Sequence, residues 1–158
     1  MTSVAGKIDA VWHFSFTVSD LDAAVSFYVE ALGCTLVRVQ EQDNAYTRSL
    51  VGYPDAHLRV AQIRIGDQDT VSGHHLELVQ YLAPGGRRGD PGIANPGAAH
   101  LAFAVLDIDA TCIRLRRMGV RLFSPPNAIT EGVNKGGWAV YLYGPDDIVH
   151  ELVQPPPR

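Results

Sequence analysis

The chain has 158 residues, of which 46% are hydrophobic and 19% are charged, and it carries a formal net charge of -4 at pH 7 with an isoelectric point near 5.8. This composition is ordinary for a globular protein of one domain or of two small half-domains. The acidic balance argues against nucleic acid or a membrane surface as a partner, because no basic stripe is present to bind phosphates.

The first half of the chain is predicted to fold as a strand, a helix and three more strands. Residues 11–18 favour the first strand, because they are apolar and contain aromatic and β-branched side chains. We expect Ser19 to cap the following helix and Gly33 to end it. The apolar side chains of this helix fall on one face: Leu21, Ala24, Val25, Tyr28 and Leu32. The remaining strands are predicted at residues 35–39, 58–65 and 75–82.

The second half is predicted to repeat this order. Residues 98–105 favour a strand, Asp107 is the expected N-cap of a helix, and Gly119 is its expected end. Three further strands are predicted, at residues 121–123, 137–143 and 148–154. A stretch rich in proline and glycine, residues 83–97, indicates a linker. We therefore expect one α+β domain made of two βαβββ modules, residues 8–82 and residues 98–154.

Two motifs occur once in each half. The segment HFSFTVSDLDA begins at His13 and aligns with HLAFAVLDIDA, which begins at His100, while the letters ELVQ start at Glu77 and again at Glu151. A carboxylate on an inward strand face is costly unless it is paired or binds a metal. A single such residue has ordinary explanations: a water-facing strand, or a satisfied core histidine. Two His and two Glu at matched positions favour a divalent cation site, if a pseudo-twofold axis brings them to one cleft.

The two cysteines, Cys34 and Cys112, stand far apart and lack the spacing of metal ligands, so we expect free thiols in a reducing compartment. No apolar run approaches the ~18 residues that a membrane span needs. The first residues lack the apolar core of a signal peptide. These features lead us to expect a cytoplasmic protein.

Two segments carry a resemblance to a known family. HFSFTVSDLDAAVSFYVEALGCTLV (residues 13–37) and LYGPDDIVHEL (residues 142–152) are similar to the opening module and to the metal-bearing last strand of the vicinal oxygen chelate superfamily. This superfamily includes glyoxalase I, methylmalonyl-CoA epimerase, extradiol dioxygenases and bleomycin-resistance proteins. The resemblance spans nearly the whole chain and implies two βαβββ modules whose curved mixed sheets surround a metal-binding cleft.

The resemblance implies four metal ligands: His13, Glu77, His100 and Glu151. This set is most similar to that of glyoxalase I, and the epimerases commonly have glutamine at the second position. The implied cofactor is a divalent ion, with nickel, zinc, cobalt, manganese and iron all compatible with mixed nitrogen and oxygen ligands. The expected reaction is proton abstraction next to a carbonyl of a chelated small molecule, as in an isomerase, epimerase or lyase. Glu151 is the first choice for the base and Glu77 the second.

Two other functions stay open at this point. An iron(II) extradiol-type dioxygenase would use only the two His and the last Glu, and an antibiotic-binding protein often lacks the ligands that are intact here. Bacterial glyoxalase I has an arginine and an asparagine that hold glutathione, and Thr17 and Tyr81 stand at these positions, which argues against glutathione. The resemblance also implies a homodimer.

Five residues are candidates for substrate binding: His75, Tyr81, Trp138, Tyr141 and Lys135. His75 alternates with Glu77 on one strand face. The three aromatic residues suit the wall of a pocket, and packing in the core is an equal alternative for each. Lys135 resembles a lysine of glyoxalase I.

Overall fold

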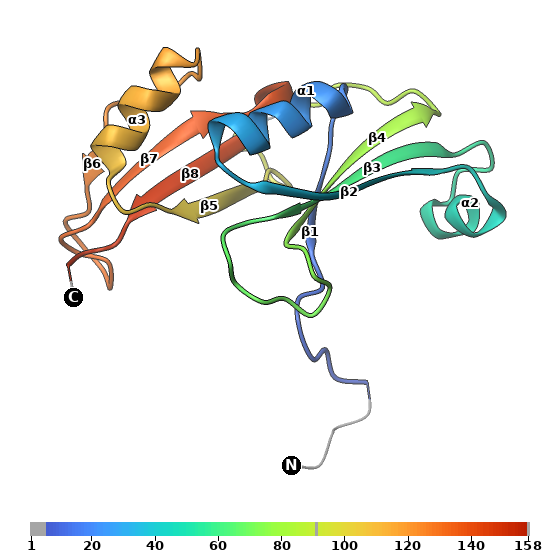
Figure 1. The fold of residues 1–158 in the computed structure, drawn as a ribbon, viewed down its shortest axis with the longest axis horizontal. Helices are drawn as coiled ribbons and strands as arrows, with labels where there is room; N and C mark the ends of the chain where they lie inside the picture. Colours follow the sequence, from blue (N-terminus) through green and yellow to red (C-terminus); the bar gives the residue numbers. More distant parts are fainter. Residues whose placement is uncertain (1–5, 91, 158) are drawn as a thin grey trace. The chain divides into compact units, whose positions relative to one another are not determined.

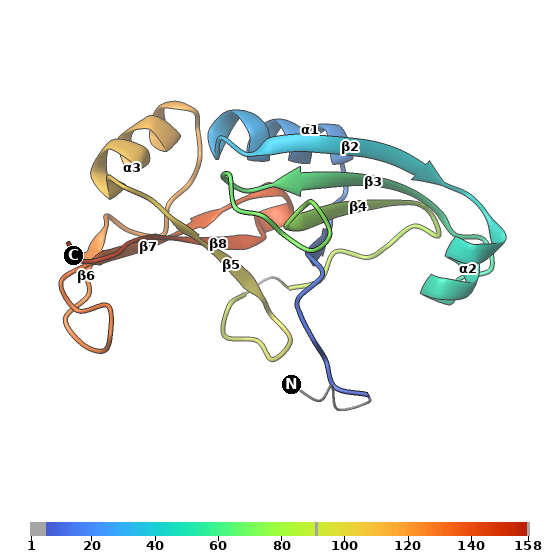
Figure 2. The same ribbon diagram turned by 60° about the horizontal axis from the view of Figure 1, so that its bottom comes forward.

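The chain forms two compact units, Met1–Gly86 and Arg87–Arg158. A computed structural model describes residues 6–90 and 92–157, so that Pro91 of the predicted linker lies outside the described residues. Each unit contains one four-stranded mixed sheet with a helix against it (Figures 1 and 2). The expected α+β class with βαβββ modules is therefore confirmed.

The sheet of the first unit has the order β1-β4-β3-β2. Its strands are β1 (Phe14–Thr17), β2 (Thr35–Gln42), β3 (His57–Arg64) and β4 (Leu76–Ala83). The first and last strands of the unit, β1 and β4, are parallel neighbours, and the other pairs are antiparallel. The predicted strand at residues 11–18 was too long at its start, since β1 begins at Phe14.

Helix α1 (Leu21–Ser26) continues directly into a π-helical turn, η1 (Phe27–Ala31). Its buried side chains recur every three or four residues, as expected for one face of a helix. Leu21, Ala24 and Tyr28 on this face have no solvent exposure. The prediction of Ser19 as N-cap was wrong by one residue. Asp20 is the N-cap, because its backbone is extended and its side chain accepts the Ala23 N–H at 3.0 Å.

A short helix, α2 (Ala45–Val51), connects β2 and β3 and was not predicted (Figure 1). Its ends carry ordinary signals: the Asn44 side chain accepts the Thr47 N–H at 2.9 Å, and Gly52 has the left-handed φ of 76°. Its large apolar side chains, Tyr46 and Leu50, are exposed. Without a buried apolar stripe, the sequence pattern gave no reason to expect a helix here.

The second unit repeats the topology with the order β5-β8-β7-β6. Its elements are β5 (His100–Ala104), α3 (Ile108–Arg117), β6 (Asn127–Ala128), β7 (Trp138–Tyr143), a 3-10 turn η2 (Pro145–Asp147) and β8 (Val149–Gln154). The outer strands β5 and β8 are again parallel. The prediction of Asp107 as N-cap is confirmed, since its side chain accepts the Ala110 N–H at 2.8 Å.

The strand predicted at residues 121–123 was wrong as a full strand. Only one isolated antiparallel bridge, between Leu122 and Leu142, forms there, and the paired strand β6 begins at Asn127. Pro125 and Pro126 lie between these two places. Because proline has no N–H to donate, the ladder with β7 is interrupted after Phe123.

The glutamine of each ELVQ motif joins the last strand of its unit to the start of its helix. Gln154 Oε1 accepts the Ile108 N–H at 2.8 Å, and Gln80 Oε1 lies 3.4 Å from the Leu21 nitrogen that donates to it. The amide of Gln80 also donates to the Ser19 carbonyl at 2.8 Å. Side chains alternate along a strand, so the glutamate three residues earlier faces the opposite side of the sheet. The repeated motif therefore places a helix cap on one face and a carboxylate on the other.

Both cysteines are buried free thiols, as expected. Burial raises the pKa of the Cys34 thiol to about 11, which keeps it protonated at neutral pH. Within residues 6–90 and 92–157, no helix has the length and apolar character to cross a bilayer.

Replacement of Gln154 by leucine is expected to destabilise the protein by about 1–2 kcal/mol, because the first N–H of α3 loses its acceptor while Ile108 stays buried. Urea unfolding followed by circular dichroism measures this change. Gln40→Leu in β2 is the matched control, since the Gln40 side chain has no hydrogen bond among the described residues. Equal stability of the two variants would contradict the capping role.

Candidate metal centre

The first unit brings His13 beside Glu77. His13 lies immediately before β1, and Ser15 of β1 is the register partner of Glu77 in β4. Residues two apart in a strand share a face, so His13 lies diagonally across from Glu77 on the face that α1 does not cover. His13 Nε2 is 3.5 Å from Glu77 Oε2. The parallel pairing of β1 with β4 thus brings together two side chains that are far apart in the sequence.

The second unit repeats this arrangement with His100 and Glu151. Ala102 of β5 is the register partner of Glu151 in β8, and His100 lies two residues before Ala102. His100 Nε2 is 3.4 Å from Glu151 Oε2. The imidazole and the carboxylate of each half therefore meet at the same register and at nearly the same distance.

His150, the neighbour of Glu151, belongs to the opposite face. Its side chain has no solvent exposure, and its ring packs edge-on against Phe103 at 5.5 Å between centroids. Burial lowers the pKa of His150 to about 4, so that the ring is neutral at pH 7. The alternation of the strand thus separates a core histidine from the carboxylate that follows it.

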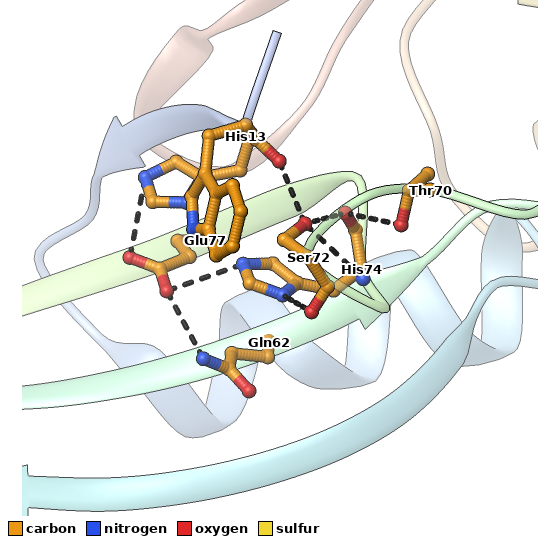
Figure 3. Close-up of polar contacts among 7 residues, drawn as sticks. His13, Gln62, Thr70, Ser72, His74 and Glu77 are labelled. Atoms are coloured by element: carbon orange, nitrogen blue, oxygen red, sulfur yellow. Dashed lines mark hydrogen bonds and ion pairs between the residues drawn. The ribbon is translucent and has the colours of Figure 1, made fainter. Parts of the chain in front are cut away.

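A second imidazole, that of His74, lies beside Glu77 in the first unit, and the sequence reasoning missed it. His74 Nε2 lies 3.2 Å from Glu77 Oε1, and the rings of His74 and His13 are 5.2 Å apart (Figure 3). His13, His74 and Glu77 each offer one ligand atom, and these three atoms lie within 4.8 Å of one another. Residue 74 is in the loop before β4, where the alternation of strand faces does not apply, and this is why only His75 was predicted.

The loop fixes the direction of the His74 ring. Its Nδ1 is 3.3 Å from the Ser72 carbonyl, which can only accept, so Nδ1 is the donor of this contact and Nε2 is the ring atom that lies toward Glu77. Ser72 Oγ lies 2.6 Å from the Trp12 carbonyl and 2.7 Å from the His74 carbonyl, which ties the segment before β1 to this loop. Figure 3 shows both imidazoles turned toward the Glu77 carboxylate.

This donor set fits a divalent cation. His13 Nδ1 and His74 Nε2 are buried atoms with no hydrogen-bond partner in the part of the chain that the structure describes. Of these two atoms only His74 Nε2 lies against the carboxylate, since His13 faces Glu77 with its Nε2. A buried polar atom without a partner is unfavourable, and a bound cation would satisfy it. Imidazole nitrogens with a carboxylate oxygen are ordinary ligands of zinc, nickel, cobalt, iron and manganese.

A second residue missed from the sequence, Gln62 of β3, also contacts Glu77. It is the register partner of Glu77, and its Nε2 donates to Glu77 Oε1 at 3.2 Å. Strand register between β3 and β4 was not available from one sequence, so no signal pointed to this side chain.

The five predicted substrate-binding residues lie in different places. Tyr141 is the register partner of Glu151, and its ring packs edge-on against His100 at 5.3 Å. Burial, and then the charge of Glu151, raises the pKa of Tyr141. Trp138 lies on the opposite face of β7, since it pairs with Gln154, whose side chain reaches α3.

The other three candidates are in the first unit or in a turn of the second. The imidazole of His75 accepts the Ile65 N–H through Nδ1 at 3.1 Å. Tyr81, four residues after Glu77 in β4, packs edge-on against Tyr53 at 6.1 Å. Lys135 is exposed, and its N–H donates to the Gly132 carbonyl.

Two duplicated βαβββ units, each with a His–Glu pair at the same register, define the fold class of this chain. Over residues 10–152 the chain matches the Glyoxalase/Bleomycin resistance protein/Dioxygenase superfamily, and it belongs to this family. The resemblance read from the sequence is thereby confirmed.

Individual relatives differ in their activities. The chain is 38% identical to a 2-epi-5-epi-valiolone epimerase of an Actinomyces species, over 93% of this chain and 80% of that protein. It is 28% identical to a probable lactoylglutathione lyase of Vibrio parahaemolyticus, over 91% of this chain and 89% of that protein. A glyoxalase family protein from Bacillus cereus shares the fold, with a TM-score of 0.80 at 22% identity over 99% of this chain and 100% of that chain.

Proposed function

We propose that this protein is a divalent-metal-dependent epimerase, which removes a proton from the carbon next to the carbonyl of a hydroxy ketone. The observation that carries the proposal is the repetition of the His–Glu pair at one register in both units. The choice of an epimerase rests on the 38% identity to the valiolone epimerase, against 26–28% for the lactoylglutathione lyases. Thr17 and Tyr81, in place of the expected glutathione-binding pair, favour the same choice.

We propose that His13, Glu77, His100 and Glu151 hold one cation between them. The donor set of two imidazoles and two carboxylates suits a borderline divalent ion, with nickel, zinc, cobalt, manganese or iron as candidates. When bound, such an ion supplies a Lewis acid that stabilises negative charge on the oxygen of a substrate carbonyl. In this proposal the two halves of the chain contribute one imidazole and one carboxylate each.

Glu151 is the proposed base. Its carboxylate takes the proton from the carbon next to the ketone, so that a C–H bond breaks, an O–H bond forms on Glu151, and the electron pair moves to the carbonyl oxygen. Solvent returns a proton to the opposite face of the same carbon while the electron pair moves back from the oxygen, which gives the epimer, and Glu151 then loses its proton to solvent. Tyr141, beside His100 and Glu151, is the proposed contact for the substrate ring or chain. Glu77 is the second candidate for a proton-transferring carboxylate.

Metal content tests the shared site. Metal-free protein titrated with Co²⁺ is expected to bind one ion per chain, measured by calorimetry and by elemental analysis after gel filtration. His13→Ala and His100→Ala are each expected to weaken this binding by at least about tenfold, because each removes a ligand. Two ions per chain, with each variant losing only one of them, would show that the pairs bind separately. A protein that takes up no ion would defeat the proposal.

Exchange of substrate hydrogen with solvent deuterium tests the base. With a valiolone epimer as substrate and Co²⁺ present, wild type is expected to exchange the hydrogen next to the ketone, followed by nuclear magnetic resonance. Glu151→Gln is expected to reduce the exchange rate by about 10²-fold or more, because the amide cannot accept the proton. Glu77→Gln is expected to retain part of the exchange at saturating Co²⁺. Equal, full exchange in both variants would refute the assigned roles.

The other functions of the family give different results in simple assays. A ring-cleaving dioxygenase consumes oxygen with catechols and iron(II), and a lactoylglutathione lyase acts on the hemithioacetal of methylglyoxal and glutathione. An antibiotic-binding protein binds its ligand without a metal. The proposed homodimer is tested by light scattering, which is expected to give about twice the 17.2 kDa mass of one chain.

A further inference from the structure

We infer that Gln62 is a positioning residue that keeps Glu77 in place as a metal ligand, so that proton abstraction falls to Glu151. This inference rests on the proposed function and specifies which of the two carboxylates is the metal ligand and which is the base. It comes from a difference between the two units, which otherwise repeat each other.

In the first unit, both oxygens of Glu77 have polar neighbours, and Gln62 donates a hydrogen bond to one of them. Oε1 accepts a hydrogen bond from Gln62 Nε2 at 3.2 Å and lies 3.2 Å from His74 Nε2, while Oε2 lies 3.5 Å from His13 Nε2 (Figure 3). Gln62 and His74 come from different elements, β3 and the loop before β4. A rotation of the Glu77 carboxylate would break the contact with Gln62 and leave a half-buried amide without its acceptor.

In the second unit, the position that matches Gln62 holds Tyr141, the register partner of Glu151. The ring of Tyr141 packs against the His100 ring, and the position that matches His74 is Ile148, which has no polar side chain. Among the described residues, Glu151 contacts His100 and has no side-chain hydrogen bond. The second carboxylate thus lacks the restraint that the first one has.

This asymmetry has a direct chemical meaning. A carboxylate that serves as a base must leave the cation and reach the substrate carbon, whereas a carboxylate that serves as a ligand must keep one orientation. Hydrogen bonds to a ligating carboxylate fix its orientation and strengthen the cation site. Gln62 therefore keeps Glu77 in the single orientation that a ligand needs. Glu151, which has Tyr141 at the matching position, keeps the mobility that a base needs.

The test removes the amide donor and keeps the size of the side chain. In Gln62→Met, the dissociation constant of metal-free protein for Co²⁺ is expected to rise about tenfold, and so is the Co²⁺ concentration needed for half-maximal deuterium exchange. The exchange rate at saturating Co²⁺ is expected to stay within about twofold of wild type, because Glu151 is unchanged. Gln40→Met, in the neighbouring strand β2, is the control and is expected to bind Co²⁺ as wild type does.

Wild-type affinity for Co²⁺ in Gln62→Met would overturn the inference, and so would a loss of exchange rate at saturating Co²⁺ with unchanged affinity. A second measurement needs no metal: in crystal structures of the metal-free proteins, Glu77 is expected to show one conformer in wild type and more than one in Gln62→Met. A single unchanged conformer in both would also overturn the inference. Failure of wild type itself to bind Co²⁺ would instead refute the proposed function, and the conformer measurement would still decide the role of Gln62.

Discussion

The parallel pairing of the first and last strand in each unit is the constraint on which the remaining features depend. A parallel pair cannot be closed by a short hairpin and needs a long crossover connection, which in both units contains a helix and two strands. This connection brings a histidine from the start of the unit next to a glutamate near its end. The register of the pair then decides which face the two side chains share, since a shift by one residue would send the carboxylate to the helix side.

Each ELVQ motif shows how one strand serves stability and chemistry together. Its leucine and glutamine face the helix, where the leucine is buried and the glutamine satisfies the first helical N–H, while its glutamate faces away. Burial of a leucine contributes about 1.5–3 kcal/mol, and the cap adds about 1 kcal/mol. These contributions hold the strand that carries the carboxylate. The same four residues thus anchor the strand on one face and present the carboxylate on the other.

Sequence reasoning was strongest where a feature depends on local pattern or on repetition. The element order, the helix start at Asp107 and the pairing of His13 with Glu77 all follow from periodicity, capping chemistry and the duplicated motif. Sequence reasoning failed for features that local sequence patterns do not determine. The helix at Ala45–Val51 buries no apolar stripe, Ser19 and Asp20 are both good caps, and the roles of Gln62 and His74 depend on strand register and on a loop conformation. The meeting of the two pairs at one cation stays a prediction.

One face of each strand thus packs against the helix, and the opposite face carries the polar side chains of the candidate site. This separation affects which positions of the chain can change. Positions that face the helix tolerate little change, because each is tied to the packing around Leu21 or Ile108. Positions such as Thr17, Tyr81 and Tyr141 lie on the other face and are outside that packing. A library confined to such positions, with His13, Glu77, His100 and Glu151 kept, leaves the packing against the helices unchanged, which makes the chain a practical starting point for evolving new substrate preferences in the laboratory.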